Sequence, residues 1–262
     1  MLNFKRLTDN HTSRTIKFFV GLRKASTSVS AAEHALLVSL SAGKRCIVEV
    51  GVFEGVTSEI FCRVMDPEGR LYLVDPFYPE TRLEKFLNMS FTQWIAVRTV
   101  RSWRQRLQFV RQPSNVAAAE LPLRGKAELI FIDARHDYES VLEDFQSWSP
   151  MLAEGAAIAF HDSHVCAARP ELQPGDGPVR LMTEIAAGQH GPWTVVDSAD
   201  SVTVVRRKAG AAAKPFSRAA SRATPRTLPR RSGGDKGALR APRAPMFNRV
   251  RGHRVPECEK LD

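Results

Sequence analysis

The segment IVEVGVFEGVTS, residues 47–58, decides how the chain is organised. An apolar run, 46–50, suits a short buried strand, and it carries one acid, Glu49. The chain leaves this strand through Gly51 and Gly55. A loop of this kind is either a plain strand-to-helix turn or a surface that a ligand contacts. The third glycine of a dinucleotide-binding loop is missing, so the spacing favours a ligand that approaches the backbone without phosphates.

Apolar runs and helical periodicity alternate along the rest of the chain, up to residue 162. Strands are predicted at 46–50, 71–75, 107–111, 127–133 and 156–162, and helices at 31–40, 56–65, 81–100, 115–121 and 138–152. This order predicts an α/β fold, a Rossmann-like three-layer sandwich with parallel strands joined by right-handed crossovers. Residues 193–207 form a predicted C-terminal hairpin. The result is a seven-stranded, mostly parallel sheet with one antiparallel strand.

Charge separates the body of the chain from its end. The chain has 262 residues and a formal net charge of +10, yet residues 206–262 hold 16 basic and 4 acidic residues. We therefore predict an N-terminal lead-in at 1–30, one folded domain at 31–207, and a disordered Arg/Ala/Pro-rich tail at 208–262. Two alternatives for the tail stay open: it binds RNA or another anionic surface, or it is an unselected product of GC-rich DNA.

The cysteines and the hydropathy of the chain indicate in which cellular compartment the protein is expected. The four cysteines show no metal-ligand spacing, and free buried thiols suit a reducing cytoplasm. No apolar run reaches the length of a membrane span, and the N-terminus lacks a signal-peptide pattern. The expected location is cytoplasmic, without a membrane partner.

Polar residues stand at the ends of four predicted strands. These are Glu49, Asp75, Asp133, and the pair His161 and Asp162. Ligands of open parallel sheets bind outside the carboxyl ends of the strands, so these side chains are expected at one binding edge. Asp75 is placed to accept hydrogen bonds from two ribose hydroxyls. Asp133 and Asp162 form an oxygen site that suits Mg²⁺.

Ordinary structural roles compete with each of these assignments. Asp133 would cap the following helix, and His161 would be a packed core histidine. His136, three residues after Asp133, is either a general base or an exposed loop residue.

Three stretches carry a resemblance to a known family: VEVGVFEGVTS, LYLVDPF and ELIFIDARHDYESVLEDFQSWSPMLAEGAAIAFHD. They resemble class I S-adenosylmethionine-dependent methyltransferases, in the right order over residues 30–207. Residues 129–162 are similar to the metal-assisted O-methyltransferases of sugars and macrolides, a methyltransferase family 24-like branch. Ala134 and Ala156 stand where that branch often has glycine.

The resemblance implies roles for nine residues of this chain. The implied cofactor-binding residues are Glu49, Gly51, Gly55, Asp75 and Ser114. The implied ligands of a divalent cation, Mg²⁺, are Asp133, His161 and Asp162, and the implied base is His136.

The expected activity is therefore methyl transfer from S-adenosylmethionine to a hydroxyl of a small molecule, such as a sugar or natural product, with metal assistance. An RNA-binding or RNA-modifying protein that uses the tail is one alternative, and a fold that binds the cofactor without catalysis is another. The aromatic-rich segment 76–105 is expected either to cover the acceptor or to pack as ordinary helix.

Overall fold

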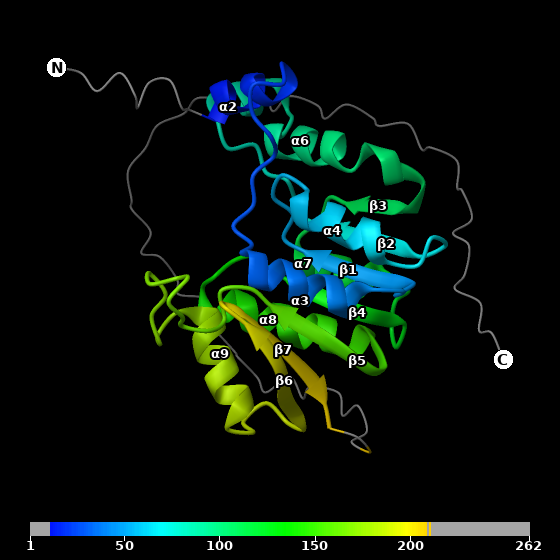
Figure 1. Ribbon diagram of the computed structural model, residues 1–262, viewed down its shortest axis with the longest axis vertical. Helices are drawn as coiled ribbons and strands as arrows, with labels where there is room; N and C mark the ends of the chain where they lie inside the picture. Colours follow the sequence, from blue (N-terminus) through cyan, green and yellow to red (C-terminus); the bar gives the residue numbers. More distant parts are fainter. Residues whose placement is uncertain (1–10, 209, 211–262) are drawn as a thin grey trace, which may run out of the picture. The chain divides into compact units, whose positions relative to one another are not determined.

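The computed structural model describes residues 11–208 and residue 210 (Figure 1). The predicted tail, 208–262, lies almost wholly outside the described residues. Its disorder and its binding of RNA therefore stay predictions.

The described residues contain one seven-stranded sheet with the strand order β3-β2-β1-β4-β5-β7-β6. The strands are β1 (Cys46–Val50), β2 (Arg70–Val74), β3 (Leu107–Val110), β4 (Ala127–Ile132), β5 (Leu152–Phe160), β6 (Trp193–Ala199) and β7 (Val202–Arg207). The pairs β5–β7 and β6–β7 are antiparallel, and all other neighbours are parallel. Only β7 therefore runs against the rest, which confirms the predicted fold class.

Helices cover both faces of the sheet (Figure 1). They are α2 (His11–Phe19), α3 (Ala31–Ser41), α4 (Val56–Val64), α5 (Arg82–Leu87), α6 (Phe91–Thr99), α7 (Ser114–Glu120), α8 (Tyr138–Trp148) and α9 (Gly177–Ala186). Two short 3-10 helices, η1 (Arg101–Arg106) and η2 (Ser149–Met151), lead into β3 and β5.

Alternation along the strands divides the core in two. Ile130 and Ile132 of β4 belong to one buried cluster, which includes Trp148 of α8. Phe131, which points to the opposite face, packs with Phe61 of α4 in the second cluster. Because both faces are covered, the central strands are apolar at nearly every position. Their polar residues are left at the carboxyl ends, an edge of the sheet that we call the carboxyl edge.

The predicted helix at 81–100 is two helices. α5 ends at Leu87, and Asn88 after it has a φ of 50°, a left-handed conformation that cannot continue a helix. Ser90 then caps α6, and its hydroxyl accepts a hydrogen bond from the backbone N–H of Gln93. Apolar spacing runs through both helices, which is why the sequence pattern joined them.

Two further boundaries differ from expectation. α8 ends at Trp148, and the chain passes through η2, which contains Pro150, before β5 starts at Leu152. α9, which begins with Gly177 and Pro178, was not predicted.

Candidate active site

Strand pairing brings the predicted site residues to the carboxyl edge. The N–H of Asp133 donates to the carbonyl of Val50 at 2.8 Å, and the N–H of His161 donates to that of Ile132 at 3.0 Å. β1, β4 and β5 therefore end level with one another. Asp133 follows β4, and His161 and Asp162 follow β5.

A small crevice lies at this edge beside the loop that follows β1. It is lined by residues 26–28, Glu49, Gly51, residues 53–57 and Asp133, and its volume is about 30 Å³. The crevice thus joins Glu49, Gly51, Gly55 and Asp133. The predicted residues Asp75 and Ser114 are not among its lining.

Both glycines of the opening segment allow backbones to pack closely. Gly51 has a φ of 88°, and a Cβ there would lie 2.0 Å from the carbonyl oxygen of Asp133. Gly55, the N-cap of α4, has a φ of 80°, and its Cβ would lie 3.0 Å from Cα of Ala96. The space at Gly51 is therefore used by the neighbouring loop. This packing is a reason for glycine that the sequence reasoning did not consider.

Glu49 is buried and accepts a hydrogen bond from the Ser58 hydroxyl at 2.6 Å. Burial raises the pKa of Glu49 to about 8, and the negative charges of Asp133 and Asp75 add to the effect of burial. The carboxyl is therefore neutral at pH 7.

Asp75 is fixed by two backbone donors. Its carboxylate accepts from the N–H of Val52 at 3.1 Å and from the N–H of Phe77 at 2.6 Å. Burial raises the pKa of Asp75 in spite of these hydrogen bonds. An ionised carboxylate has about four acceptor positions, so the two hydroxyls of a ribose still find acceptors there.

The side chain of Ser114 joins two helices. Its hydroxyl accepts a hydrogen bond from the indole N–H of Trp148 at 2.7 Å, which links α7 to α8. Ser114 is the first residue of α7, and the N–H of such a residue has no partner within its helix. A contact of Ser114 with adenine would therefore come from its backbone N–H.

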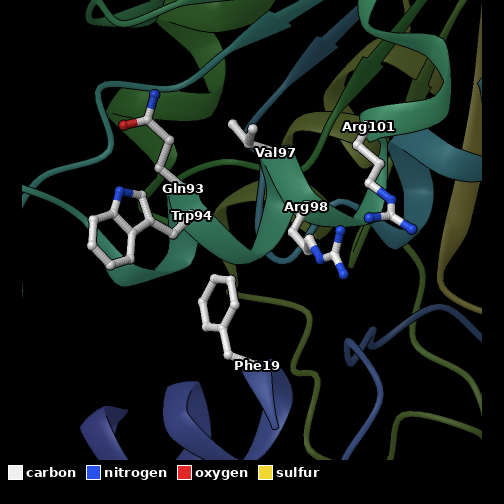
Figure 2. Close-up of a pocket in the computed structure, with 6 residues that line it drawn as sticks. All are labelled: Phe19, Gln93, Trp94, Val97, Arg98 and Arg101. Atoms are coloured by element: carbon white, nitrogen blue, oxygen red, sulfur yellow. The ribbon is translucent and has the colours of Figure 1, made fainter. Parts of the chain in front are cut away.

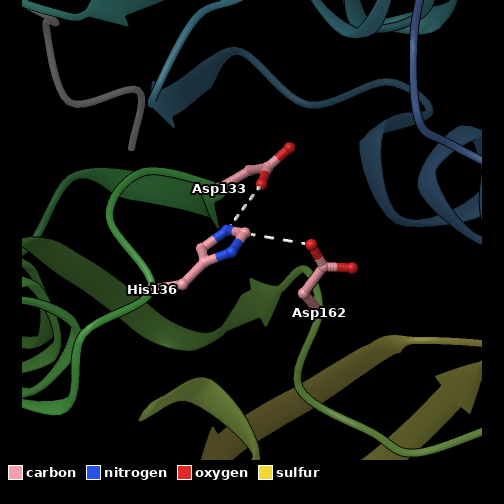
Figure 3. Close-up of side chains that lie close together, drawn as sticks. All are labelled: Asp133, His136 and Asp162. Atoms are coloured by element: carbon pink, nitrogen blue, oxygen red, sulfur yellow. Dashed lines mark ion pairs between the residues drawn. The ribbon is translucent and has the colours of Figure 1, made fainter. Parts of the chain in front are cut away.

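Asp133, His136 and Asp162 converge from the ends of β4 and β5 (Figure 3). Nε2 of His136 lies 3.6 Å from Oδ1 of Asp133 and 3.8 Å from Oδ2 of Asp162. One ligand atom from each of the three residues lies within 4.8 Å of the other two. The nearby carboxylate of Asp133 raises the pKa of His136 above its usual value, although burial acts against this shift.

His161 lies behind this cluster. Its Nδ1 is 3.4 Å from Oδ1 of Asp133 and 3.3 Å from Oδ1 of Asp162, and its Nε2 is 3.4 Å from Oε2 of Glu33. Burial favours the neutral ring, but the three carboxylates outweigh burial and raise the pKa of His161 to about 11. An imidazolium has no lone pair for a metal. In this arrangement His161 is a buried cation that holds the aspartates, and its predicted role as a metal ligand stays untested.

Arg169 is a site residue that the sequence analysis missed. It lies between β5 and α9, and its guanidinium donates to Oδ1 of Asp162 at 2.7 Å. The Ser201 hydroxyl lies 3.3 Å from the same oxygen, whereas Oδ2 of Asp162 faces His136. The two carboxylates are hard oxygen donors, so they fit a divalent cation that shares the site with Arg169, and the imidazole of His136 is a borderline donor beside them.

Residues 23–28 are tied to the crevice by Glu54. The buried Glu54 carboxylate accepts from the guanidinium of Arg23 at 2.8 Å and from the N–H of Ser26 at 2.7 Å. Sequence reasoning assigned this stretch to a lead-in. The signal in the sequence was Glu54, an acid inside the glycine loop, because an acid buried there needs a cationic partner from elsewhere in the chain.

Comparison with known proteins agrees with this geometry. Residues 48–163 match the methyltransferase family 24 model, which is described as a methyltransferase domain. The matched stretch is similar to a methyltransferase domain, and it holds the glycine loop, Asp133, His136 and Asp162. No curated protein sequence matches the chain.

Solved structures share the fold of this chain. Cofactor-bound Rv0187 from MTB has a TM-score of 0.54 and 17% identity, covering 77% of this chain and 94% of its own. The O-methyltransferase TomG from Streptomyces achromogenes, solved in complex with SAM, has a TM-score of 0.52 and 19% identity, covering 76% and 90%. A protein from Corynebacterium glutamicum has a TM-score of 0.51 and 13% identity, covering 76% and 97%. Within the described part of the chain, no helix has the length and apolar character needed to cross a bilayer.

Proposed function

We propose that this protein is a methyltransferase that transfers the methyl group of S-adenosylmethionine to a hydroxyl oxygen of a small molecule. The observation that carries the proposal is the meeting of Asp133, His136 and Asp162 beside an acid-lined crevice at the carboxyl edge. The crevice would receive the cofactor, and the three residues would receive the acceptor.

Charge supports the cofactor assignment. S-adenosylmethionine carries a sulfonium and an ammonium group, and the ionised carboxylate of Asp133 lines the crevice. The neutral carboxyl of Glu49 and the Arg23-paired carboxylate of Glu54 add oxygen acceptors. Asp75 would hold the ribose hydroxyls, and Gly51 and Gly55 would shape the loop beneath the methionine part. The family match and the fold shared with TomG, an O-methyltransferase in complex with SAM, agree with this assignment.

Size indicates that the crevice must widen for the whole cofactor to enter. A volume of about 30 Å³ accommodates about one water molecule, whereas ligand pockets reach roughly 300–1,000 Å³. Residues 26–28 line the crevice and belong to no helix or strand. We propose that this segment moves when the cofactor binds.

His136 is the proposed base. Its ring is about half exposed, so an acceptor can reach it, and Asp133 orients its Nε2. The acceptor oxygen would form a bond to the methyl carbon as the carbon–sulfur bond breaks, and His136 would take the hydroxyl proton. A divalent cation bound by Asp133 and Asp162 would lower the pKa of the acceptor hydroxyl. His161 and Arg169 would hold the two aspartates in place.

Thermal unfolding of the full chain with S-adenosylmethionine tests the cofactor assignment. A ligand that binds only the folded state adds about 2.7 kcal/mol of stability at a hundredfold excess over its Kd, so the midpoint must rise. Asp75→Asn should abolish the rise, and Asp197→Asn, a change at an exposed position of β6, should leave it unchanged. A wild-type midpoint that stays constant at millimolar cofactor would refute the proposal.

Isothermal titration with Mg²⁺ and with Mn²⁺ tests the metal assignment by itself. Binding that is lost in Asp133→Asn and Asp162→Asn, and kept in Asp66→Asn, supports a cation at this cluster. Heat that is equal in all four proteins would remove the cation from the proposal while leaving the cofactor assignment intact.

A further inference from the structure

A second cavity lies between α2 and α6. It is lined by Phe19, Gln93, Trp94, Val97, Arg98 and Arg101 (Figure 2), and its volume is about 630 Å³. None of these residues lines the crevice at the carboxyl edge. We call this cavity the α2–α6 groove.

The sequence builds one wall of the groove by helical spacing. Trp94, Val97, Arg98 and Arg101 stand at positions i, i+3, i+4 and i+7, so they share one side of α6 and of the turn that follows it. Ala96, which is buried, points away from them, and its backbone lies next to the glycine loop after β1. The outward side of α6 is therefore free to bind something other than the sheet.

The other wall is α2, which is fixed to α6 at its first residue. Nε2 of His11 lies 3.2 Å from the hydroxyl of Thr92, and the His11 ring stacks on Phe91 with centroids 6.0 Å apart. At the opposite end of α2, Phe19 meets Trp94 edge to face at 6.3 Å. The two rings border the groove (Figure 2).

The lining combines exposed aromatic surface with positive charge. Phe19 is 48% exposed, and Trp94 and Val97 are each 45% exposed. Large apolar side chains that are exposed together mark binding sites more often than isolated ones do. Among the residues that the structure describes, no acidic group forms an ion pair with Arg98 or Arg101.

The surrounding aromatic segment, 76–105, was expected either to cover the acceptor or to pack as helix. Three of its aromatic residues are buried or packed against the core: Phe77, Phe91 and Trp103. Three are exposed: Tyr78, Phe86 and Trp94. Only Trp94 of these six lines the α2–α6 groove.

We propose that the α2–α6 groove binds a small aromatic anion, a flat apolar molecule that carries a carboxylate, sulfonate or phosphate. The rings of Phe19 and Trp94 would contact its apolar body. The guanidinium groups of Arg98 and Arg101 would pair with its negative charge. The volume of the groove falls in the range of about 300–1,000 Å³ that is typical of small-molecule sites.

Charge argues against two other occupants. Residues 206–262 hold 16 basic and 4 acidic residues, so they would be repelled by the two arginines. A second copy of the chain, docked groove to groove, would bring its own Arg98 and Arg101 against the first pair. Like charges at an interface oppose association.

Fluorescence titration of the full chain with anilinonaphthalene sulfonate tests the proposal, since this probe is an aromatic sulfonate. We expect saturable binding of one equivalent and no comparable binding of phenylnaphthylamine, a neutral molecule of similar shape. The Arg98→Ala/Arg101→Ala double variant should weaken binding roughly tenfold or more. Trp94→Ala should weaken it as well. Arg104→Ala, in η1 but outside the groove, should bind like the wild type.

Circular dichroism and the unfolding midpoint of each variant separate a lost site from a lost fold. The arginines are at the surface, so their removal should leave both readings unchanged. The proposal is overturned if the double variant binds the probe as tightly as the wild type. It is also overturned if the neutral molecule binds equally well or if Arg104→Ala causes the same loss.

Discussion

The buried carboxyl of Glu49 makes the stability of the protein depend on pH. Its pKa is about 8 in the folded chain, against an ordinary value of 4.5. Below pH 4.5 the carboxyl is protonated in both the folded and the unfolded state, so its ionisation takes nothing from the free energy of unfolding. As the pH rises toward 8, the unfolded state loses the proton while the folded state keeps it, and stability falls. Each pH unit in this window costs up to about 1.4 kcal/mol, so the loss from pH 5 to pH 7 is about 2–3 kcal/mol.

Glu49→Gln removes this ionisation and keeps an oxygen that can accept the Ser58 hydroxyl. Urea unfolding of the wild type and the variant at pH 5, 6, 7 and 8 measures the effect as a difference, in which other titrating groups cancel. The stability of Glu49→Gln relative to the wild type should increase by about 2–3 kcal/mol between pH 5 and pH 7. Glu68→Gln, whose side chain is 82% exposed, should follow the wild type. Equal pH dependence in the wild type and Glu49→Gln would show that Glu49 is ionised in the folded chain and would refute the reasoning.

Two further changes test the packing of the loops and the role of the arginine. Gly51→Ala places a Cβ 2.0 Å from a backbone oxygen at a φ of 88°, and we expect a loss of about 3 kcal/mol or more in urea unfolding. Gly125→Ala has a similar φ of 71° but open space, so it should lose only about 1 kcal/mol, and equal losses would contradict the packing argument. Arg169→Ala frees Oδ1 of Asp162, so Mg²⁺ should bind more tightly in calorimetry, while Arg135→Ala, an exposed change, should not alter binding. Weaker Mg²⁺ binding in Arg169→Ala would mean that the arginine supports the cation.

The fold was predictable because burial on both faces of the sheet leaves a strong signal. The apolar runs at 46–50 and 127–133 are typical of strands that are covered on both faces of a sheet, and β1 and β4 are such strands. Boundaries set by single residues were harder to predict. Asn88 ends a helix by its backbone conformation, whereas its neighbours keep the helical spacing of apolar residues. α9, which starts at Gly177, was not predicted, and the glycine and proline at its start are residues more typical of turns.

The candidate site was predictable only where a residue's place follows from its strand. Asp133 and Asp162 stand directly after β4 and β5, so their proximity follows from the sheet. Glu33 and Arg169 reach the same place from a helix and a long loop, and no spacing in the sequence connects them to it. Ser114 shows that the position of a residue along the chain does not predict the partner of its side chain. Its place after β3 was right, but its partner, Trp148, could only be found in three dimensions.

The charges around the aspartates explain how two carboxylates remain together at the carboxyl edge. Glu33, Asp133 and Asp162 bring three negative charges, and His161 and Arg169 bring two positive charges in direct contact with them. The cluster therefore keeps one excess negative charge, and His136, which we propose faces the acceptor, lies within 4 Å of both aspartates. Positive charge is therefore favoured at that place, whether it comes from a bound cation or from the histidine when it holds a proton. A site built in this way suits a reaction in which a proton leaves an oxygen, because the group that receives the proton already lies beside two carboxylates that stabilise its charge.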